Sequence, residues 1–329
     1  MKSTIYCRGR RQLFRLRSNK AAGGQRLDQW LSSMIEGLSR SEAKRIIDIG
    51  GVQIDGRRVR SCSVSMDEGR RLEVHTDGAS LEPFRLEEAH ILFRDKYLLV
   101  LNKPAGIETQ PTPARYKGTL YEALLHLLGP VSGRKKPELG MVQRLDRGTS
   151  GLMVFSLHKK AHRGLSQIFL EHRVEKRYLA LVESAPVPEQ GEIRSLLARS
   201  RRLNRSLSVE KGGKEAITRY RTRCATPEGA LVEVELLTGR SHQIRAHLSE
   251  IGAPLLGDTL YGGPQQVAGL VLERPLLHAW TLGFQHPVTG ETLKFELPLP
   301  ADMQSVCSKL FEPSTYTVTD MGNVDLPTN

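Results

Sequence analysis

The sequence predicts an α+β protein with two folded units. A small α/β module precedes a larger domain with a mixed, mainly antiparallel sheet and a central cleft. The 329 residues exceed what a single compact unit of ordinary size needs. Residues 25–76 form a self-contained pattern of helical spacing followed by a hairpin. After a polar, acidic stretch, short strands and turns alternate with only a few helices.

These changes of pattern set the expected domain boundaries. Residues 1–23 form a basic N-terminal arm with seven Lys or Arg and no acid, which fits either a phosphate-contacting arm or an organelle transit peptide. The small module spans 24–76, the linker 77–89 and the large domain 90–312. The polar, aperiodic residues 313–329 predict a flexible tail.

The small module begins with an amphipathic helix. Its apolar residues recur at helical spacing: Leu27, Trp30, Leu31, Met34 and Leu38. Ser39 and Glu42 make a capping box for a second helix, which ends at Gly50-Gly51. A hairpin with the turn pair Asp55-Gly56 follows.

Basic residues gather on the outward positions of the second helix and the hairpin. They are Arg40, Lys44, Arg45, Arg57, Arg58 and Arg60. Such a cluster suits backbone phosphates, although charged runs often only keep a face solvated. The whole pattern resembles the S-four-type RNA-binding module, which implies that this surface binds RNA.

Composition and charge indicate which kind of partner the protein binds and in which compartment it works. Lys and Arg number 48 against 36 Asp and Glu, and the net charge of +12 favours a polyanionic partner such as nucleic acid. The cysteines are far apart, which predicts neither disulfides nor a cysteine zinc site. No apolar run suits a bilayer or a secretory signal. We expect a cytoplasmic monomer without a membrane partner, with organelle targeting by the basic N-terminus left open.

Asp146 is the first candidate for chemistry. The run from Gly140 leads through Asp146 and a turn-rich segment into an apolar strand over 152–157, so the carboxylate lies where a strand becomes a loop. Arg144 and Arg147 flank it and would keep it ionised. On the residues alone, an Asp that caps its own turn fits equally well.

Residues 143–151, Gln-Arg-Leu-Asp-Arg-Gly-Thr-Ser-Gly, resemble the active-site signature of the RluA-type family of RNA pseudouridine synthases. Three further segments match in the same order: 95–106, 176–182, and 239–245 continuing to 257–258. The resemblance implies an isomerase that acts on uridines in structured RNA. It favours large ribosomal RNA first and tRNA second, with no cofactor.

The resemblance also implies roles for single residues. Asp146 becomes the essential carboxylate, Tyr178 stacks on the uracil or handles a proton, and Arg245 pairs with Asp146. Substrate binding is assigned to Arg144, Arg240 and Gln143, the last of which stands where the family commonly has His. Without the resemblance, Tyr178 would be a core residue of a strand and Arg245 a surface residue of a helix.

Other chemistries find little support in the sequence. The histidines lack the H-x-x-x-H spacing, so we expect no metal. Neither a Rossmann nor a P-loop glycine pattern occurs, which predicts no nucleotide cofactor. The serious alternative is a non-catalytic RNA-binding or ribosome-assembly factor on the same fold.

Overall fold

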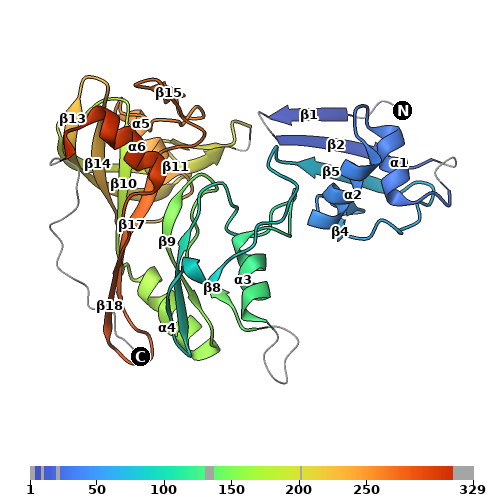
Figure 1. Ribbon diagram of the computed structural model, residues 1–329, viewed down its shortest axis with the longest axis horizontal. Coiled ribbons are helices and arrows are strands. Elements are labelled where there is room, and N and C mark those ends of the chain that lie inside the picture. The colour runs from blue at the N-terminus through green and yellow to red at the C-terminus, as the bar shows by residue number, and fades with distance from the viewer. Residues whose placement is uncertain (1–3, 9–10, 20–22, 130–136, 201, 314–329) are drawn as a thin grey trace. The chain divides into compact units, whose positions relative to one another are not determined.

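A computed structural model describes residues 4–8, 11–19, 23–129, 137–200 and 202–313 (Figure 1). Contacts within the chain divide it into two units. The N-terminal unit comprises Met1–Glu87 and Ile107–Pro137, and the large unit comprises Glu88–Gly106 and Glu138–Asn329. Each unit is described by itself.

The N-terminal unit is a five-stranded antiparallel sheet, in the order β1-β2-β5-β3-β4, with helices on one face. Its elements are β1 Thr4–Arg8, β2 Arg11–Arg17, α1 Leu27–Met34, α2 Arg40–Ile49, β3 Val52–Ile54, β4 Arg57–Val59, β5 Arg71–Thr76 and α3 Leu120–Leu128. Apolar residues of α1 and α2 pack with those of β2, β3 and β5 into one core. Burial of these apolar side chains is the main stabilising contribution.

The predicted elements of the small module are confirmed. Ser39 and Glu42 form both hydrogen bonds of the capping box, and Gly50 ends α2 in the left-handed region. Asp55 and Gly56 both have positive φ, as a tight hairpin turn requires. The first helix ends at Met34 rather than near Leu38, which lies beyond it.

Residues 11–17 are not a loose arm. They form β2, which pairs with β1 on one side and with β5 on the other. Phe14 and Leu16 enter the core, while Arg15 and Arg17 are exposed. The excess of basic residues obscured this period-two alternation, so the prediction of an arm was wrong for this segment.

The stretch expected to be a linker is anchored within the N-terminal unit. The buried carboxylate of Asp77 accepts two hydrogen bonds from Arg115, from Nε at 2.8 Å and Nη2 at 3.0 Å. Arg115 Nη2 also donates to the carbonyl of Ser80. Residues 107–137, which the sequence analysis assigned to the large domain, therefore belong here. A pair separated by 38 positions leaves no periodic signal in a sequence.

The large unit is built on a mixed sheet. Its elements are η2 Glu88–His90, β6 Ile91–Arg94, β7 Leu98–Lys103, β8 Gly140–Met141, β9 Ser150–Ser156, α4 Lys159–Leu170, β10 Glu175–Val182, β11 Gln190–Ser200, β12 Arg205–Ser208, β13 Lys214–Thr226, β14 Gly229–Leu236, α5 Gln243–Glu250, β15 Gln266–Val267, β16 Leu270–Val271, β17 Leu277–Gln285, β18 Thr292–Glu296 and α6 Ala301–Leu310.

The main sheet has eleven strands within the described residues, in the order β12-β11-β13-β14-β10-β17-β9-β7-β6, with β18 on β17 and β8 on β9. Only the described pairing of β17 with β9 is parallel. The predicted mixed, mainly antiparallel sheet is confirmed.

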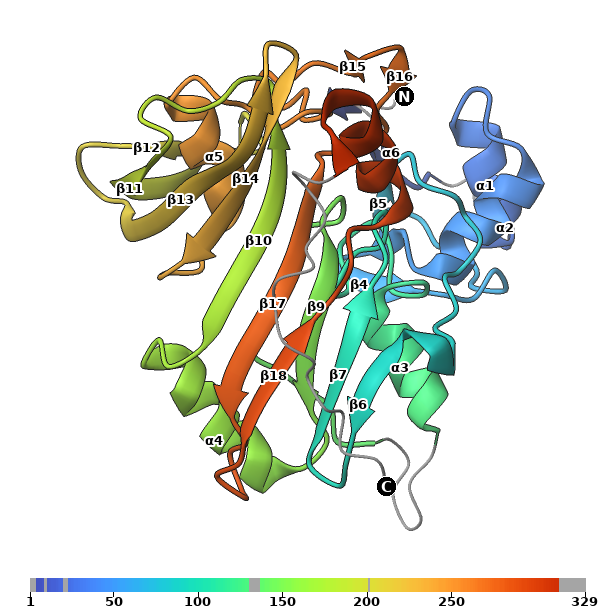
Figure 2. The same ribbon diagram turned by 60° about the vertical axis from the view of Figure 1, so that its left-hand side comes forward.

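Helices cover both faces of this sheet (Figure 2). Helix α6 packs on one face, against Leu179 and Leu181 of β10. Helix α4 packs on the opposite face with Val174, and α5 is bonded to Thr218 of β13 on that same face. Because side chains alternate along a strand, Tyr178 shares the face that carries α4 and α5.

Candidate active site

Asp146 begins a tight turn between β8 and β9. The amide of Thr149 donates to the carbonyl of Asp146 at 3.0 Å and closes the turn. The fully buried Lys103 donates from Nζ to the carbonyl of Thr149 at 2.8 Å, with longer contacts of 3.4 Å to the carbonyls of Asp146 and Arg147. Arg274 donates to the remaining carbonyl, that of Gly148. The turn is thus held at all four carbonyls.

Lys103 is a positioning residue that the sequence analysis missed. The segment around it was interpreted as scaffold, although a lysine at the end of a strand that begins with a buried apolar run was an available signal. A buried ammonium group needs several acceptors to offset the loss of hydration. The carbonyls of the Asp146 turn supply them.

Gly151 brings this turn close to Tyr178. In the sheet register, Gly151 of β9 lies opposite Ala279 of β17, which lies opposite Tyr178 of β10. Gly151 has φ of +114°, and a Cβ atom there would lie 2.2 Å from the Ala279 carbonyl oxygen. Only glycine tolerates both the conformation and the close approach.

Arg245 joins Asp146 to a second carboxylate. Its Nε and Nη2 donate to the two oxygens of Asp258 at 2.6 and 2.8 Å, and its Nη1 donates to Asp146 Oδ2 at 3.3 Å. Burial lowers the pKa of Arg245, but the hydrogen bonds and charge of Asp258, and then the charge of Asp146, raise it above its ordinary value overall. The guanidinium therefore stays charged beside Asp146.

The arginines next to Asp146 in the chain do not make this ion pair. Arg147 Nε donates to the carbonyl of Gly106, and Arg144 is exposed. The charge that orients the carboxylate comes instead from a helix 99 positions further along the chain. The predicted pairing of Asp146 with Arg245 is present. The sequence analysis gave Asp258 no role and included it only as the end of a matching segment.

Tyr178 is buried, with 7% of its surface exposed. Burial, and then the negative charge of Asp146, raises the pKa of its phenol well above the usual range. The hydroxyl therefore remains protonated at neutral pH. A protonated phenol is suited to placing its neutral ring against the nucleobase. It is not suited to accepting a proton as a general base.

Two more side chains adjoin the ion pair, and the sequence analysis assigned neither. The ring of Tyr261 lies 4.9 Å from the guanidinium carbon of Arg245. His242 Nε2 lies 3.9 Å from Asp146 Oδ2. The best available signal in the sequence was position: His242 lies inside the matching segment 239–245, and Tyr261 lies shortly after 257–258.

Gln143 and Arg240 are not brought to the Asp146 carboxylate by any described contact. The Nε2 of Gln143 is buried and has no hydrogen-bond partner among the described residues. Arg240 Nε donates to the carbonyl of Glu215 at 2.8 Å. The surroundings of Gln143 and Arg240 therefore do not support the predicted binding of substrate by these two residues.

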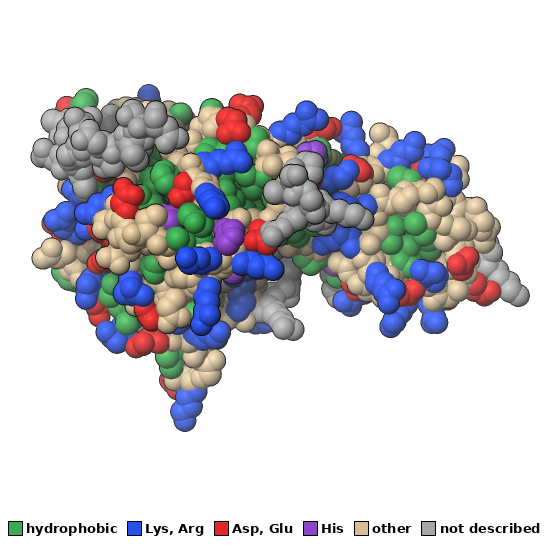
Figure 3. Space-filling view, turned by 90° about the horizontal axis from the view of Figure 1, so that it is seen from below, with side chains coloured by type: hydrophobic (Ala, Val, Ile, Leu, Met, Phe, Trp, Pro, Cys, Tyr) green, Lys and Arg blue, Asp and Glu red, His purple; other side chains and the backbone are tan. Residues whose placement is uncertain are grey.

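The predicted RNA-binding residues of the N-terminal unit divide into two groups. Arg40 pairs with the buried Asp28 at 2.8 Å, and Arg58 donates to the carbonyls of Gly50 and Thr112, so both support the fold. The other four are exposed: Lys44, Arg45, Arg57 and Arg60, of which Arg60 lies over the ring of Tyr116. Figure 3 shows Lys and Arg interspersed with Asp and Glu on one face of the molecule.

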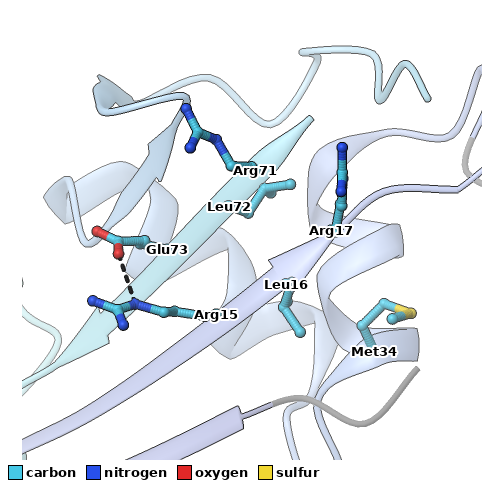
Figure 4. A pocket seen from close by; sticks show the side chains of 7 residues that line it. All are labelled: Arg15, Leu16, Arg17, Met34, Arg71, Leu72 and Glu73. Carbon is cyan, nitrogen blue, oxygen red and sulfur yellow. Dashed lines mark hydrogen bonds and ion pairs between the residues drawn. The ribbon is translucent and has the colours of Figure 1, made fainter. Parts of the chain in front are cut away.

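A hollow of about 550 Å³ lies on the N-terminal unit (Figure 4). Strands β2 and β5 and helix α1 line it, and an ion pair between Arg15 and Glu73 crosses one edge at 2.9 Å. Arg17 and Arg71 stand on neighbouring strands beside it. Its lining contains three cations, three apolar side chains and one carboxylate, that of Glu73, which is paired with Arg15.

His278 links the stability of the large unit to pH. It lies beside Ser150 near the Asp146 turn, with Nδ1 2.8 Å from the serine hydroxyl. Burial, and then the charge of Arg274, lowers the pKa of His278 from 6.5 to about 4. The unfolded chain therefore binds more protons than the folded one between these values, and stability falls as pH drops through this window.

We expect this residue to cost about 3 kcal/mol of unfolding free energy between pH 7.5 and pH 4. His278→Asn retains an acceptor for Ser150 and should reduce the pH dependence by about that amount. Urea denaturation at several pH values measures both proteins. Parallel pH profiles for the two proteins would refute this assignment.

Within the described residues, no group of His, Cys, Asp and Glu side chains is arranged to hold a metal ion. No helix in the described part of the chain combines the length and apolar character of a bilayer span.

Family comparisons match both units. A family model described as RNA pseudouridylate synthase matches residues 97–250, and an S4 domain model matches residues 25–66. The first match includes Asp146, Tyr178 and Arg245. Fold and site therefore define an RNA-modifying isomerase with an appended RNA-binding domain.

The chain belongs to the RNA pseudouridine synthase family. It is 33% identical over 350 residues to RNA pseudouridine synthase 2, chloroplastic, of Arabidopsis thaliana, covering 88% of this chain and 81% of that protein. It is 38% identical over 298 residues to ribosomal large subunit pseudouridine synthase D of Zymomonas mobilis, covering 85% and 92%.

A solved structure agrees with the fold. The structure of human RNA pseudouridylate synthase domain containing 4 aligns with a TM-score of 0.55 and 25% identity, covering 68% of this chain and 95% of that one. The resemblances noted in the sequence, to this enzyme family and to the S4-type module, are confirmed.

Proposed function

We propose that this enzyme isomerises uridines in large-subunit ribosomal RNA, with Asp146 as its catalytic carboxylate. The observation that carries the assignment of Asp146 is its hydrogen bond to Arg245, which is itself fixed by Asp258. The choice of RNA is supported by the relative from Zymomonas mobilis, whose name assigns it to the large ribosomal subunit.

The chemistry needs a charged and oriented carboxylate. Attack by Asp146 on either the uracil ring or the sugar carbon lets the bond from the sugar to N1 break. The freed base rotates and its C5 bonds to the sugar. The bond between Asp146 and the substrate breaks and returns the carboxylate, the C5 proton leaves and N1 gains a proton. The reaction is balanced without an oxidant, a reductant or a second substrate.

Arg245 and Tyr178 have distinct roles in this proposal. A guanidinium fixed by Asp258 orients the Asp146 carboxylate and places a positive charge beside it. The neutral ring of Tyr178 supports the uracil while it is detached from the sugar. A positioned base recombines far faster than one that is free to diffuse.

RNA affinity is assigned mainly to Lys44, Arg45 and Arg57. Replacing all three by Ala should weaken binding of the RNA roughly tenfold or more and flatten its salt dependence, because fewer counterions are released. Single-turnover rates at saturating enzyme should stay unchanged. Filter binding at several salt concentrations measures the affinity.

Lys309 provides the control for this variant. It is an exposed cation on α6, which packs on the sheet face opposite Tyr178. Lys309→Ala should leave affinity within about twofold of the parent, as expected for a cation outside the interface. A loss of affinity in Lys309→Ala that equals, per charge removed, the loss in the triple variant would mean that net charge alone matters.

Maps of pseudouridine across the transcriptome test the choice of substrate. Cells that lack the protein should lose defined sites in large-subunit ribosomal RNA, and the parent gene should restore them. Loss confined to transfer RNA would select the second candidate substrate. An unchanged map, with ribosomal RNA still crosslinked to the protein, would favour an assembly factor without catalytic activity.

A further inference from the structure

His242 stands at the third position of the turn that the Gln243 amide closes on the Arg240 carbonyl at 3.2 Å. Its φ of 55° and ψ of 23° lie in the left-handed region, where a residue other than glycine is uncommon. It precedes α5 as the N-cap residue, yet its side chain makes no capping hydrogen bond. The backbone of His242 begins the helix, since its carbonyl accepts from the Ala246 amide at 2.9 Å, while its ring contacts other side chains.

The ring stands between Asp146 and Tyr261. Its Nδ1 lies 3.1 Å from the Tyr261 hydroxyl, and its Nε2 lies 3.9 Å from Asp146 Oδ2. Arg245 Nη1 contacts that same oxygen at 3.3 Å. Within the described part of the chain both of these neighbours approach Oδ2, so Oδ1 is the oxygen left for the substrate.

Tyr261 determines how the ring can be protonated. Its hydroxyl oxygen accepts from the amide of Ser206 at 2.7 Å, and its own proton can go to the Ser206 carbonyl at 3.2 Å or to His242 Nδ1. Burial raises the pKa of Tyr261 to about 12, so the phenol keeps its proton. The Ser206 hydroxyl is bonded in turn to the carbonyl of Ser241.

The negative charge of Asp146 decides whether the Tyr261 hydroxyl donates to His242 or to Ser206. If Tyr261 donates to Nδ1, the neutral imidazole carries its proton on Nε2 and presents a donor to Asp146. If Tyr261 donates to Ser206, a neutral ring would turn a lone pair toward the negative Oδ2, which is repulsive. The first arrangement is favoured, and the donors then run in one direction from Ser206 to Asp146.

We propose that His242 is a positioning residue that acts with Arg245 to fix Oδ2 of Asp146, so that Oδ1 meets the substrate, and that Tyr261 sets its orientation. This inference rests on the proposed role of Asp146. The inference requires this 3.9 Å separation to shorten when RNA binds, since polar contacts of free enzymes commonly tighten in the complex.

Two substitutions separate the contacts of the ring. His242→Asn tolerates the left-handed conformation and keeps an acceptor for Tyr261, but its shorter side chain cannot reach Asp146. Tyr261→Phe removes the hydroxyl and keeps the ring against Arg245. His172→Asn is the matched control, since His172 is also a left-handed histidine but is exposed at the end of α4.

The assay uses an unmodified transcript of large-subunit ribosomal RNA with tritium on C5 of uridine, because that hydrogen is released on isomerisation. We expect His242→Asn and Tyr261→Phe each to lower the single-turnover rate by roughly 10- to 100-fold. RNA affinity and melting temperature should stay near those of the parent. The double variant should be no slower than the slower single variant.

A folded His242→Asn protein with the parental rate would overturn the proposal, as would equal loss in His172→Asn. Multiplicative losses in the double variant would mean that Tyr261 does not act through His242. Asp146→Asn is assayed in parallel. Full activity in that protein would defeat the proposed function itself, whereas loss there with a normal rate in His242→Asn defeats only this inference.

Discussion

Asp146→Asn should lower turnover roughly 10⁴-fold or more while RNA affinity stays within about twofold. The amide is nearly the same size as the carboxylate and can still accept a hydrogen bond from Arg245. It lacks the negative charge and the nucleophilic oxygen that the reaction needs. Single-turnover release of the C5 hydrogen measures the rate, and filter binding measures the affinity.

Asp67→Asn is the control for this change, because Asp67 is an exposed carboxylate of the N-terminal unit. It should retain parental activity. Residual activity above about a hundredth of the parent in Asp146→Asn would contradict a nucleophilic role, since loss of a nucleophile typically costs far more. Loss of RNA affinity in step with the rate would indicate a binding residue instead.

Arg245→Met should be the most destabilising single substitution in the site. It leaves the carboxylate of Asp258, which is 1% exposed, buried without its cation. Removing one partner of a buried ion pair costs about 3–5 kcal/mol. Urea denaturation at pH 7.5 measures this loss, and activity should fall with it because Asp146 also loses its partner.

The double variant Arg245→Met with Asp258→Asn separates these two effects. It removes the unpaired charge, so stability should recover by about 1–3 kcal/mol relative to Arg245→Met alone. Catalysis should remain low, because nothing then orients Asp146. Recovered activity in the double variant would show that Arg245 serves the fold only.

The sequence by itself determined most of the local structure. The capping box of Ser39 and Glu42, the turn at Asp55-Gly56 and the strand that carries Tyr178 all form as predicted. These signals are local, because each depends on residues a few positions apart. Asp146 was found in the same way, from one continuous motif with a known family resemblance.

The tertiary structure alone decided what surrounds Asp146. The carbonyl contacts of Lys103 lie 43 to 46 positions away, and Arg245 lies 99 positions away. Of the arginines adjacent to Asp146 in the sequence, Arg147 contacts the carbonyl of Gly106, and Arg144 is exposed. Long-range pairing of charges follows from the register of the sheet, and no periodic pattern encodes it.

Long-range pairing also explains why parts of the N-terminal unit were not predicted from the sequence. Basic residues obscured the alternation in 11–17, and the strand that pairs with this segment, β5, lies at Arg71–Thr76. The ion-pair partner of Asp77 is Arg115, 38 positions further along the chain. Burial of an ion pair or a strand depends on which surfaces meet after the chain has folded. The sequence therefore determined which residues carry the chemistry, and the fold decided which neighbours control it.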